Sequence, residues 1–188
     1  ASVQGLSQEQ YSSYYSSGYY FNDHPNFFSP LYYTTTPQTV TSISITANQV
    51  SDYGSYTQTN QYFSLTFRGY FIPSASGVYT FSSTSNDSSL VYVGTSGQNL
   101  ALLQQSAQAS NSISGTGLVV NNSGTHSSAT VSGTSASLVS GSIYPILIYY
   151  GNNNGSGNLS FAYQGPSGGA QSSLTGGQFV LAQPLTAG

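Results

Sequence analysis

Apolar and polar side chains alternate one for one along much of the chain, and this period of two constrains the fold more than any other feature. Residues 63–68 read Phe-Ser-Leu-Thr-Phe-Arg, residues 79–82 read Tyr-Thr-Phe-Ser, and residues 159–164 read Leu-Ser-Phe-Ala-Tyr-Gln. Successive side chains of a strand point to opposite faces, so each segment would place one face in a core and the other in water. Residues 90–93 and 143–150 are apolar on both faces and predict central strands covered on both sides.

Turn residues separate these segments. Clusters of Gly, Asn and Ser stand at residues 76–77, 94–97, 151–157 and 165–169. The segment 98–109 has a Leu, Ala and Gln composition that suits a short helix, although it lacks a clean apolar stripe. Many short strands joined by such turns predict an all-β fold, an antiparallel β-sandwich or barrel with long loops. Weaker strand candidates are residues 40–45, 118–120, 129–131 and 179–181.

The length and the aromatic content indicate one folded domain. The 188 residues fit a single domain, 1–188, and 17 Tyr and 9 Phe can bury enough surface to order it. Disordered chains are poor in such residues. Residues 1–38 carry clusters of Tyr and Phe between Ser and Gly, and we expect an aromatic-rich lead-in that wraps the sheet. The chain has no cysteine, so disulfides do not stabilise it.

The near absence of charge excludes whole classes of partner. Arg68 is the sole Lys or Arg, against the acids Glu9, Asp23, Asp52 and Asp87. One arginine cannot neutralise a run of phosphates, which excludes nucleic acid, and it cannot hold an anionic membrane surface. Solubility must then come from Ser, Thr, Asn and Gln. Such a surface suits the outside of a cell, where neutral hydroxyl-rich polymers are the neighbours.

The sequence also argues against an enzyme. A glycosidase needs two carboxylates across a glycosidic bond, and Asp52 with Asp87 is the one plausible pair. No feature of the sequence brings these two residues together. His24 and His126 lie far apart without a spaced partner, so a transition-metal site is not expected either. We therefore predict a binding or structural domain rather than a catalyst.

Five segments in order carry a family pattern. They are 67–73 (Phe-Arg-Gly-Tyr-Phe-Ile-Pro), 76–81 (Ser-Gly-Val-Tyr-Thr-Phe), 85–94 (Ser-Asn-Asp-Ser-Ser-Leu-Val-Tyr-Val-Gly), 140–150 (Ser-Gly-Ser-Ile-Tyr-Pro-Ile-Leu-Ile-Tyr-Tyr) and 158–161 (Asn-Leu-Ser-Phe). This pattern resembles the PA14 superfamily and, within it, the fungal flocculin and GLEYA adhesins. The resemblance covers most of the chain. It implies a PA14-type sandwich in an extracellular or cell-wall adhesin.

The same resemblance implies a calcium-dependent lectin. In those adhesins two consecutive acidic residues, joined by a cis peptide bond, hold calcium together with an Asn from a later loop, and sugar hydroxyls complete the coordination. Asn86 and Asp87 match the paired position, and Asn152 matches the loop Asn. These three residues are the expected metal ligands. With Asn153 and Asn154 they form the expected site for neutral glycans.

One departure from the family pattern and several alternatives stay open. Asn86 replaces the first acid of the pair, which leaves one carboxylate and implies weak calcium binding or none. Asn-Asp-Ser is also good turn chemistry, so an ordinary hairpin turn is the alternative interpretation of Asn86 and Asp87. The segment 151–158 would then be a solvated connection. The alternative function is a structural matrix module that associates with itself through exposed Tyr and neutral β-edges.

Overall fold

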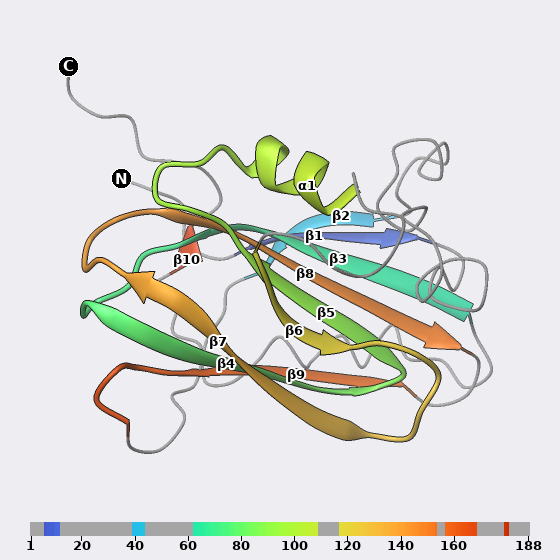
Figure 1. The fold of residues 1–188 in the computed structure, drawn as a ribbon. Helices are drawn as coiled ribbons and strands as arrows, with labels where there is room; N and C mark the ends of the chain where they lie inside the picture. Colours follow the sequence, from blue (N-terminus) through green and yellow to red (C-terminus); the bar gives the residue numbers. More distant parts are fainter. Residues whose placement is uncertain are drawn as a thin grey trace.

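In the part of the chain that the structure describes, the fold is a sandwich of two antiparallel β-sheets with one short helix, shown in Figure 1. The computed structural model describes residues 6–11, 39–43, 62–108, 117–153, 157–168 and 179–180. Its elements are β1 (Leu6–Tyr11), β2 (Thr39–Ile43), β3 (Tyr62–Phe71), β4 (Gly77–Asn86), β5 (Ser88–Val93), α1 (Leu100–Gln108), β6 (Leu118–Asn122), β7 (Ala129–Leu138), β8 (Tyr144–Asn153), β9 (Asn158–Gln164) and β10 (Phe179–Val180). The all-β sandwich predicted from the alternating pattern is therefore confirmed.

The strand order places the two apolar segments in the interior of the larger sheet. In the larger sheet six strands run β2-β1-β3-β8-β5-β6, and β10 pairs with β3 as the seventh. The smaller sheet has three strands in the order β7-β4-β9. β8 pairs with β3 over ten residues, from Tyr62 opposite Asn153 to Phe71 opposite Tyr144. Its other edge pairs with β5. Nine of the ten β8 positions are buried, as expected of a strand covered on both faces.

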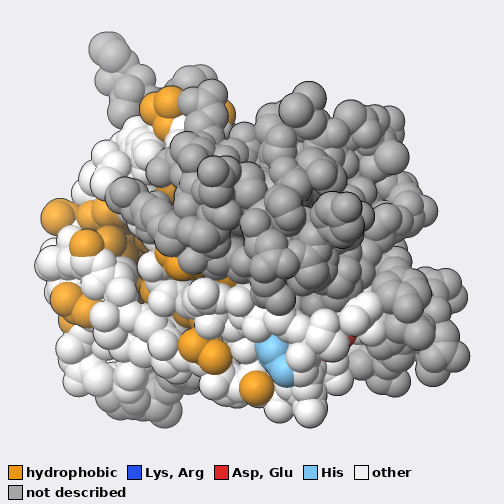
Figure 2. All heavy atoms as spheres, turned by 45° about the vertical axis from the view of Figure 1, so that its right-hand side comes forward, with side chains coloured by type: hydrophobic (Ala, Val, Ile, Leu, Met, Phe, Trp, Pro, Cys, Tyr) orange, Lys and Arg blue, Asp and Glu red, His pale blue; other side chains and the backbone are white. Residues whose placement is uncertain are grey.

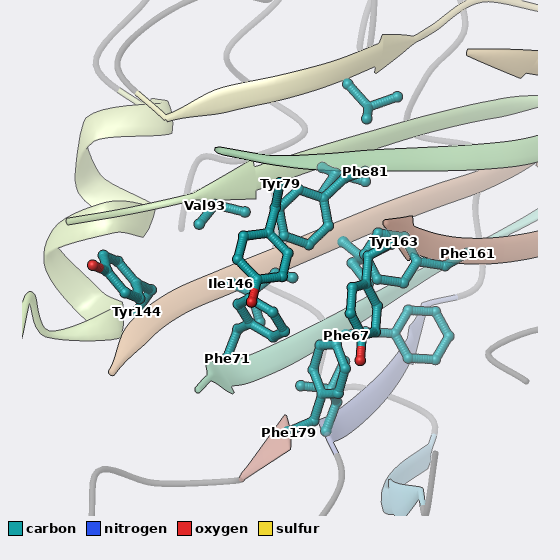
Figure 3. Close-up of a cluster of buried hydrophobic side chains, with 14 of the residues drawn as sticks. Phe67, Phe71, Tyr79, Phe81, Val93, Tyr144, Ile146, Phe161, Tyr163 and Phe179 are labelled. Atoms are coloured by element: carbon teal, nitrogen blue, oxygen red, sulfur yellow. The ribbon is translucent and has the colours of Figure 1, made fainter. Parts of the chain in front are cut away.

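The aromatic residues of the alternating segments form the centre of the sandwich, shown in Figure 3. Phe71 has no exposed surface, and its ring meets four others. The centroid of Tyr79 lies 5.4 Å away and that of Phe81 5.5 Å, both edge-on. Tyr163 and Phe179 approach at 5.5 and 5.2 Å. Edge-to-face contacts at such distances add to the stabilisation from burial, so this cluster joins the two sheets.

The short helix covers part of the outer face of the larger sheet. α1 begins beside β3, where the Leu100 N–H donates to the Tyr70 hydroxyl at 3.0 Å. Leu103, a residue of α1, is buried. This confirms the helix predicted over residues 98–109. The described segments contain no helix that is both long and apolar enough to cross a bilayer.

One expectation is wrong in part. Residues 6–11 are not a lead-in but strand β1, which lies between β2 and β3 in the larger sheet. Leu6 is fully buried, and Ser7 stands opposite Arg68. The segment has no strong strand pattern of its own, so pairing on both edges, rather than local propensity, sets its structure. The remaining lead-in residues, 12–38, lie outside the described residues.

At one end of the sandwich the core changes from aromatic to polar. The inner row of β4 continues from Phe81 to the buried Ser83 and Ser85. Ser85 Oγ donates to the main-chain oxygen of Asp87 at 2.7 Å. Its one proton is thereby used, so in the 2.8 Å contact Ser89 donates to Ser85, and in the 2.7 Å contact Ser83 donates to Ser89. The buried polar network is thus directed toward the backbone of Asp87.

Candidate functional site

Three connections meet at this polar end of the sandwich, on the right-hand side of Figure 1. They are the turn from β4 to β5, the loop 123–128 between β6 and β7, and the two ends of the β8–β9 connection, of which residues 154–156 lie outside the described segments. The pairing registers bring them together, because Ser88 stands opposite Gly151 and Asn86 opposite Asn158. Binding residues concentrate on such loop clusters, since a rigid sheet positions them.

Asp87 is the charged centre of this cluster. Only 4% of its surface is exposed. The His126 N–H donates to Oδ1 at 3.1 Å, and the Asn153 N–H donates to Oδ2 at 2.7 Å. A buried carboxylate is tolerable when hydrogen bonds compensate its lost hydration, and bonds to an ionised acceptor are the strong ones. Asp87 therefore ties the β6–β7 loop and the end of β8 to the β4–β5 turn.

Asn86 precedes Asp87 through a cis peptide bond, which the family resemblance implies. The Tyr150 hydroxyl donates to the Asn86 main-chain oxygen at 2.6 Å. The surroundings of the Asn86 amide decide which way it faces. With its nitrogen toward Asp87 Oδ1 and the His126 main-chain oxygen it donates to both, at 3.2 and 3.0 Å, whereas its oxygen would meet only acceptors there.

The β6–β7 loop is a part of the cluster that the sequence did not reveal. Ser88 Oγ donates to the Gly124 oxygen at 2.7 Å, and Asn153 Nδ2 donates to Thr125 Oγ1 at 3.2 Å. Asn158 Nδ2 donates to Ser128 Oγ at 3.3 Å. The loop sequence, Ser-Gly-Thr-His-Ser-Ser, carries no pattern that indicates a site. Its place beside Asp87 depends on the strand order, which no local pattern encodes.

Asn152 joins the cluster through Gly157 and Tyr150. It is fully buried at the end of β8. A methyl group added at Gly157 would lie 2.8 Å from Asn152 Oδ1 and would also collide with the Tyr150 hydroxyl. The same hydroxyl bonds to Asn86, so these contacts connect the start of β9 to the Asn86–Asp87 turn. Glycine is required at position 157 because the side chains of Asn152 and Tyr150 fill the space around it.

We expect Gly157→Ala to lower the free energy of unfolding by about 1–3 kcal/mol, the usual cost of overpacking a filled site. Gly165→Ala is the matched control, because the nearest atom to an added methyl group there is a Tyr79 ring carbon at an ordinary 3.9 Å. Chemical denaturation of both variants measures the difference. Equal stability of the two would contradict the close packing at Gly157.

The structure brings together four of the five predicted site residues. Asn86, Asp87, Asn152 and Asn153 all lie at this end of the sandwich, while Asn154 lies outside the described residues. One boundary is wrong, because residues 151–153 belong to β8 rather than to a loop. They pair with Ser64, Phe63 and Tyr62 of β3, and this pairing outweighs the turn preference of Gly and Asn.

Comparison with known proteins assigns the family. A model of the PA14 domain matches residues 11–175, which is most of the chain. The chain belongs to the PA14 domain family. No curated protein matches this PA14 domain in sequence.

Solved structures of low sequence identity share its fold. The A domain of Epithelial Adhesin 6 from Candida glabrata, in complex with Galβ1-3GlcNAc, aligns with a TM-score of 0.69 and 19% identity, covering 96% of this chain and 88% of that one. The A domain of Epithelial Adhesin 9, also from Candida glabrata, in complex with Galβ1-4GlcNAc, aligns with a TM-score of 0.66 and 17% identity. The alignment covers 95% of this chain and 90% of that one. A PA14 sugar-binding domain from an RTX adhesin aligns with a TM-score of 0.63 and 13% identity, covering 95% of this chain and 99% of that one.

The donor set of this PA14 domain fits a hard cation such as calcium. Calcium takes oxygen ligands from carboxylates, amide oxygens and main-chain carbonyls. Asp87 supplies a carboxylate, Asn86 and Asn152 carry amide oxygens, and the His126 carbonyl lies 3.0 Å from the Asn86 amide. Within the described segments no three His, Cys, Asp or Glu residues gather into a cluster. A cation here would therefore rest on one carboxylate and on neutral oxygens.

The charge around the PA14 site is low. Arg68, the only Lys or Arg of the chain, lies six residues along β3 from Tyr62, which stands opposite Asn153. Six residues of a strand span about 20 Å. In Figure 2 the described surface is mostly white, meaning neutral polar side chains and backbone, with separate orange patches. The site thus combines one buried anion with neutral hydrogen-bonding groups.

Proposed function

We propose that this PA14 domain is an extracellular, non-catalytic adhesin module that binds neutral glycans with the help of calcium at Asp87. One observation carries the proposal: the buried Asp87 carboxylate lies where the β4–β5 turn, the β6–β7 loop and the end of β8 meet, bonded by two main-chain N–H groups and beside the Asn86 amide. The fold is shared with two adhesin domains described in complex with galactose-containing disaccharides and with a domain named as sugar-binding. Those ligands support a glycan as the class of partner.

The residues of the site would have different roles in binding. Asp87 would provide the charge that holds the ion, and the Asn86 and Asn152 amide oxygens would be neutral ligands beside it. Calcium, when bound, accepts neighbouring sugar hydroxyls as further oxygen ligands. Around it, Asn153 and Thr125 carry a side-chain amide and a hydroxyl, which donate to and accept from sugar hydroxyls.

The charge distribution supports neutral glycans over acidic ones. A sialate or sulfate is recognised by a cation, ideally a bidentate arginine. The only Lys or Arg of the chain is Arg68, and it lies about 20 Å along β3 from the site. The buried negative charge of Asp87 would repel an anionic sugar further. We therefore expect acidic glycans to be rejected.

The same geometry supports binding without catalysis. Glycoside hydrolysis needs a second carboxyl group on the other side of the bond, and in the described segments the one other acid is Glu9, on β1 opposite Thr66. A site with one charged ligand gives weak single contacts. Adhesion would then depend on many copies that bind together.

A glycan array tests the proposal. The wild-type domain is applied in millimolar calcium and again in excess chelator, and the supernatant is assayed for released reducing sugar. We expect binding to neutral galactose-type or related glycans in calcium only, with no sugar released. Concentration-dependent self-association without any glycan signal would instead favour the matrix module, and released sugar would favour an enzyme.

A further inference from the structure

The Asn86 amide occupies a position that a cation would also favour. Its nitrogen donates to Asp87 Oδ1 at 3.2 Å and to the His126 main-chain oxygen at 3.0 Å. Both partners are acceptors, one of them charged, so the amide hydrogens supply the positive end of a dipole between two oxygens. An ion bound to the same two oxygens would supply a full positive charge in the same place.

The Asn86 amide and a calcium ion would compete for the same acceptor position on Asp87 Oδ1. Each carboxylate oxygen has two acceptor positions. Oδ1 already accepts from the His126 N–H and, in this orientation, from the Asn86 amide. Oδ2 accepts from the Asn153 N–H. An ion that binds at Oδ1 while the His126 N–H bond is kept must therefore displace the Asn86 nitrogen.

A half-turn of the same amide converts it from donor to ligand. Its oxygen would then stand about 3 Å from both Asp87 Oδ1 and the His126 carbonyl oxygen, a separation that suits neighbouring oxygens in a shell with calcium–oxygen bonds of about 2.3–2.6 Å. Three oxygens from two different loops would converge on one point. The turn changes no backbone contact, since Tyr150 holds the Asn86 carbonyl separately.

We infer that Asn86 is a built-in substitute for the cation: its amide nitrogen neutralises the Asp87–His126 oxygen pair in the metal-free domain, and its oxygen turns to the ion on binding, with the His126 carbonyl as a further ligand. This inference rests on the proposed calcium site. The inference gives a role to Asn86, which stands where the related adhesins have the first acidic residue of the pair. The site keeps its shape without metal, and in exchange it binds calcium more weakly than two carboxylates would.

The test compares Asn86→Asp with wild type by thermal unfolding in chelator and in millimolar calcium. In chelator the variant faces Asp87 with a second carboxylate and lacks the amide hydrogens, so its Tm should fall by about 5 °C or more. Calcium should restore that loss, bind about tenfold more tightly than to wild type, and raise the wild-type Tm only slightly. Asn121→Asp adds the same charge at an exposed position of β6 and should show neither effect.

Equal Tm values for wild type and Asn86→Asp in chelator, or unchanged calcium affinity in the variant, would overturn the inference. If the variant fails to fold, the wild type still decides: the side-chain amide NMR signal of Asn86 should shift when calcium replaces chelator, and a signal that stays in place contradicts the turn. Neither readout uses a sugar. A glycan array without binding, beside these calcium effects, would overturn the proposed function and leave this inference standing.

Discussion

Asp87→Asn should abolish calcium-dependent glycan binding, with a loss of at least about 100-fold, or about 2.7 kcal/mol. The substitution keeps the size of the side chain and removes its charge. It also turns an acceptor into a donor, because the new NH₂ group must face either the His126 or the Asn153 N–H. The free energy of unfolding should fall by about 2–3 kcal/mol for a buried group left without its proper partner.

Two measurements separate the loss of the ion from the loss of the fold. Circular dichroism fixes a temperature at which Asp87→Asn is folded, and sugar titrations are made there with and without calcium. Calcium should no longer raise the Tm of the variant, since a ligand that does not bind cannot stabilise. Ser160→Ala, an exposed change on the neighbouring β9, is the control and should bind like wild type. Undiminished glycan binding by Asp87→Asn would remove Asp87 from the site.

Phe71→Ala should cost about 3–5 kcal/mol of stability, the usual range for deleting a buried aromatic side chain. Phe71 has no exposed surface and contacts the rings of Tyr79, Phe81, Tyr163 and Phe179, so one truncation removes packing from both sheets. The chain has no disulfide to offset the loss. A native stability of about 5–15 kcal/mol leaves little after such a change.

Urea denaturation of Phe71→Ala measures this effect. Leu102→Ala is the matched control, because Leu102 is 54% exposed on α1 and its truncation should change stability by less than about 0.5 kcal/mol. A loss below about 1 kcal/mol for Phe71→Ala would show that the aromatic cluster does not hold the sheets together.

The fold was predictable where the hydrophobic pattern is strong. The period of two in residues 63–68 and 159–164, and the apolar run 143–150, predict β3, β9 and β8. The faces expected to meet water are wrong in part, because Thr66 on β3 and Ser82 on β4 are buried. β1 was missed because Leu6–Tyr11 carries no such pattern and becomes a strand by pairing with β2 and β3. A local sequence pattern does not predict which distant segments pair with each other.

The site was predictable only in part, for the same reason. Asn86, Asp87 and Asn152 were identified from the resemblance to adhesins, and all three lie at the same end of the sandwich. Their role as ligands stays a prediction. The contribution of His126 is made by its main-chain N–H and carbonyl, which every residue carries. The role of His126 therefore comes from the position of its backbone beside Asp87 and not from its side chain. The sequence therefore offered no signal for it.

A crystal structure of the domain grown in calcium with a glycan selected from the array tests the central claim most directly. The measured quantity is the position of the ion and its distances to the protein oxygens. The account predicts a calcium ion about 2.3–2.6 Å from an Asp87 carboxylate oxygen, with sugar hydroxyls completing its shell. A glycan bound elsewhere on the domain, with the Asp87 carboxylate contacting only its amide donors, would contradict it.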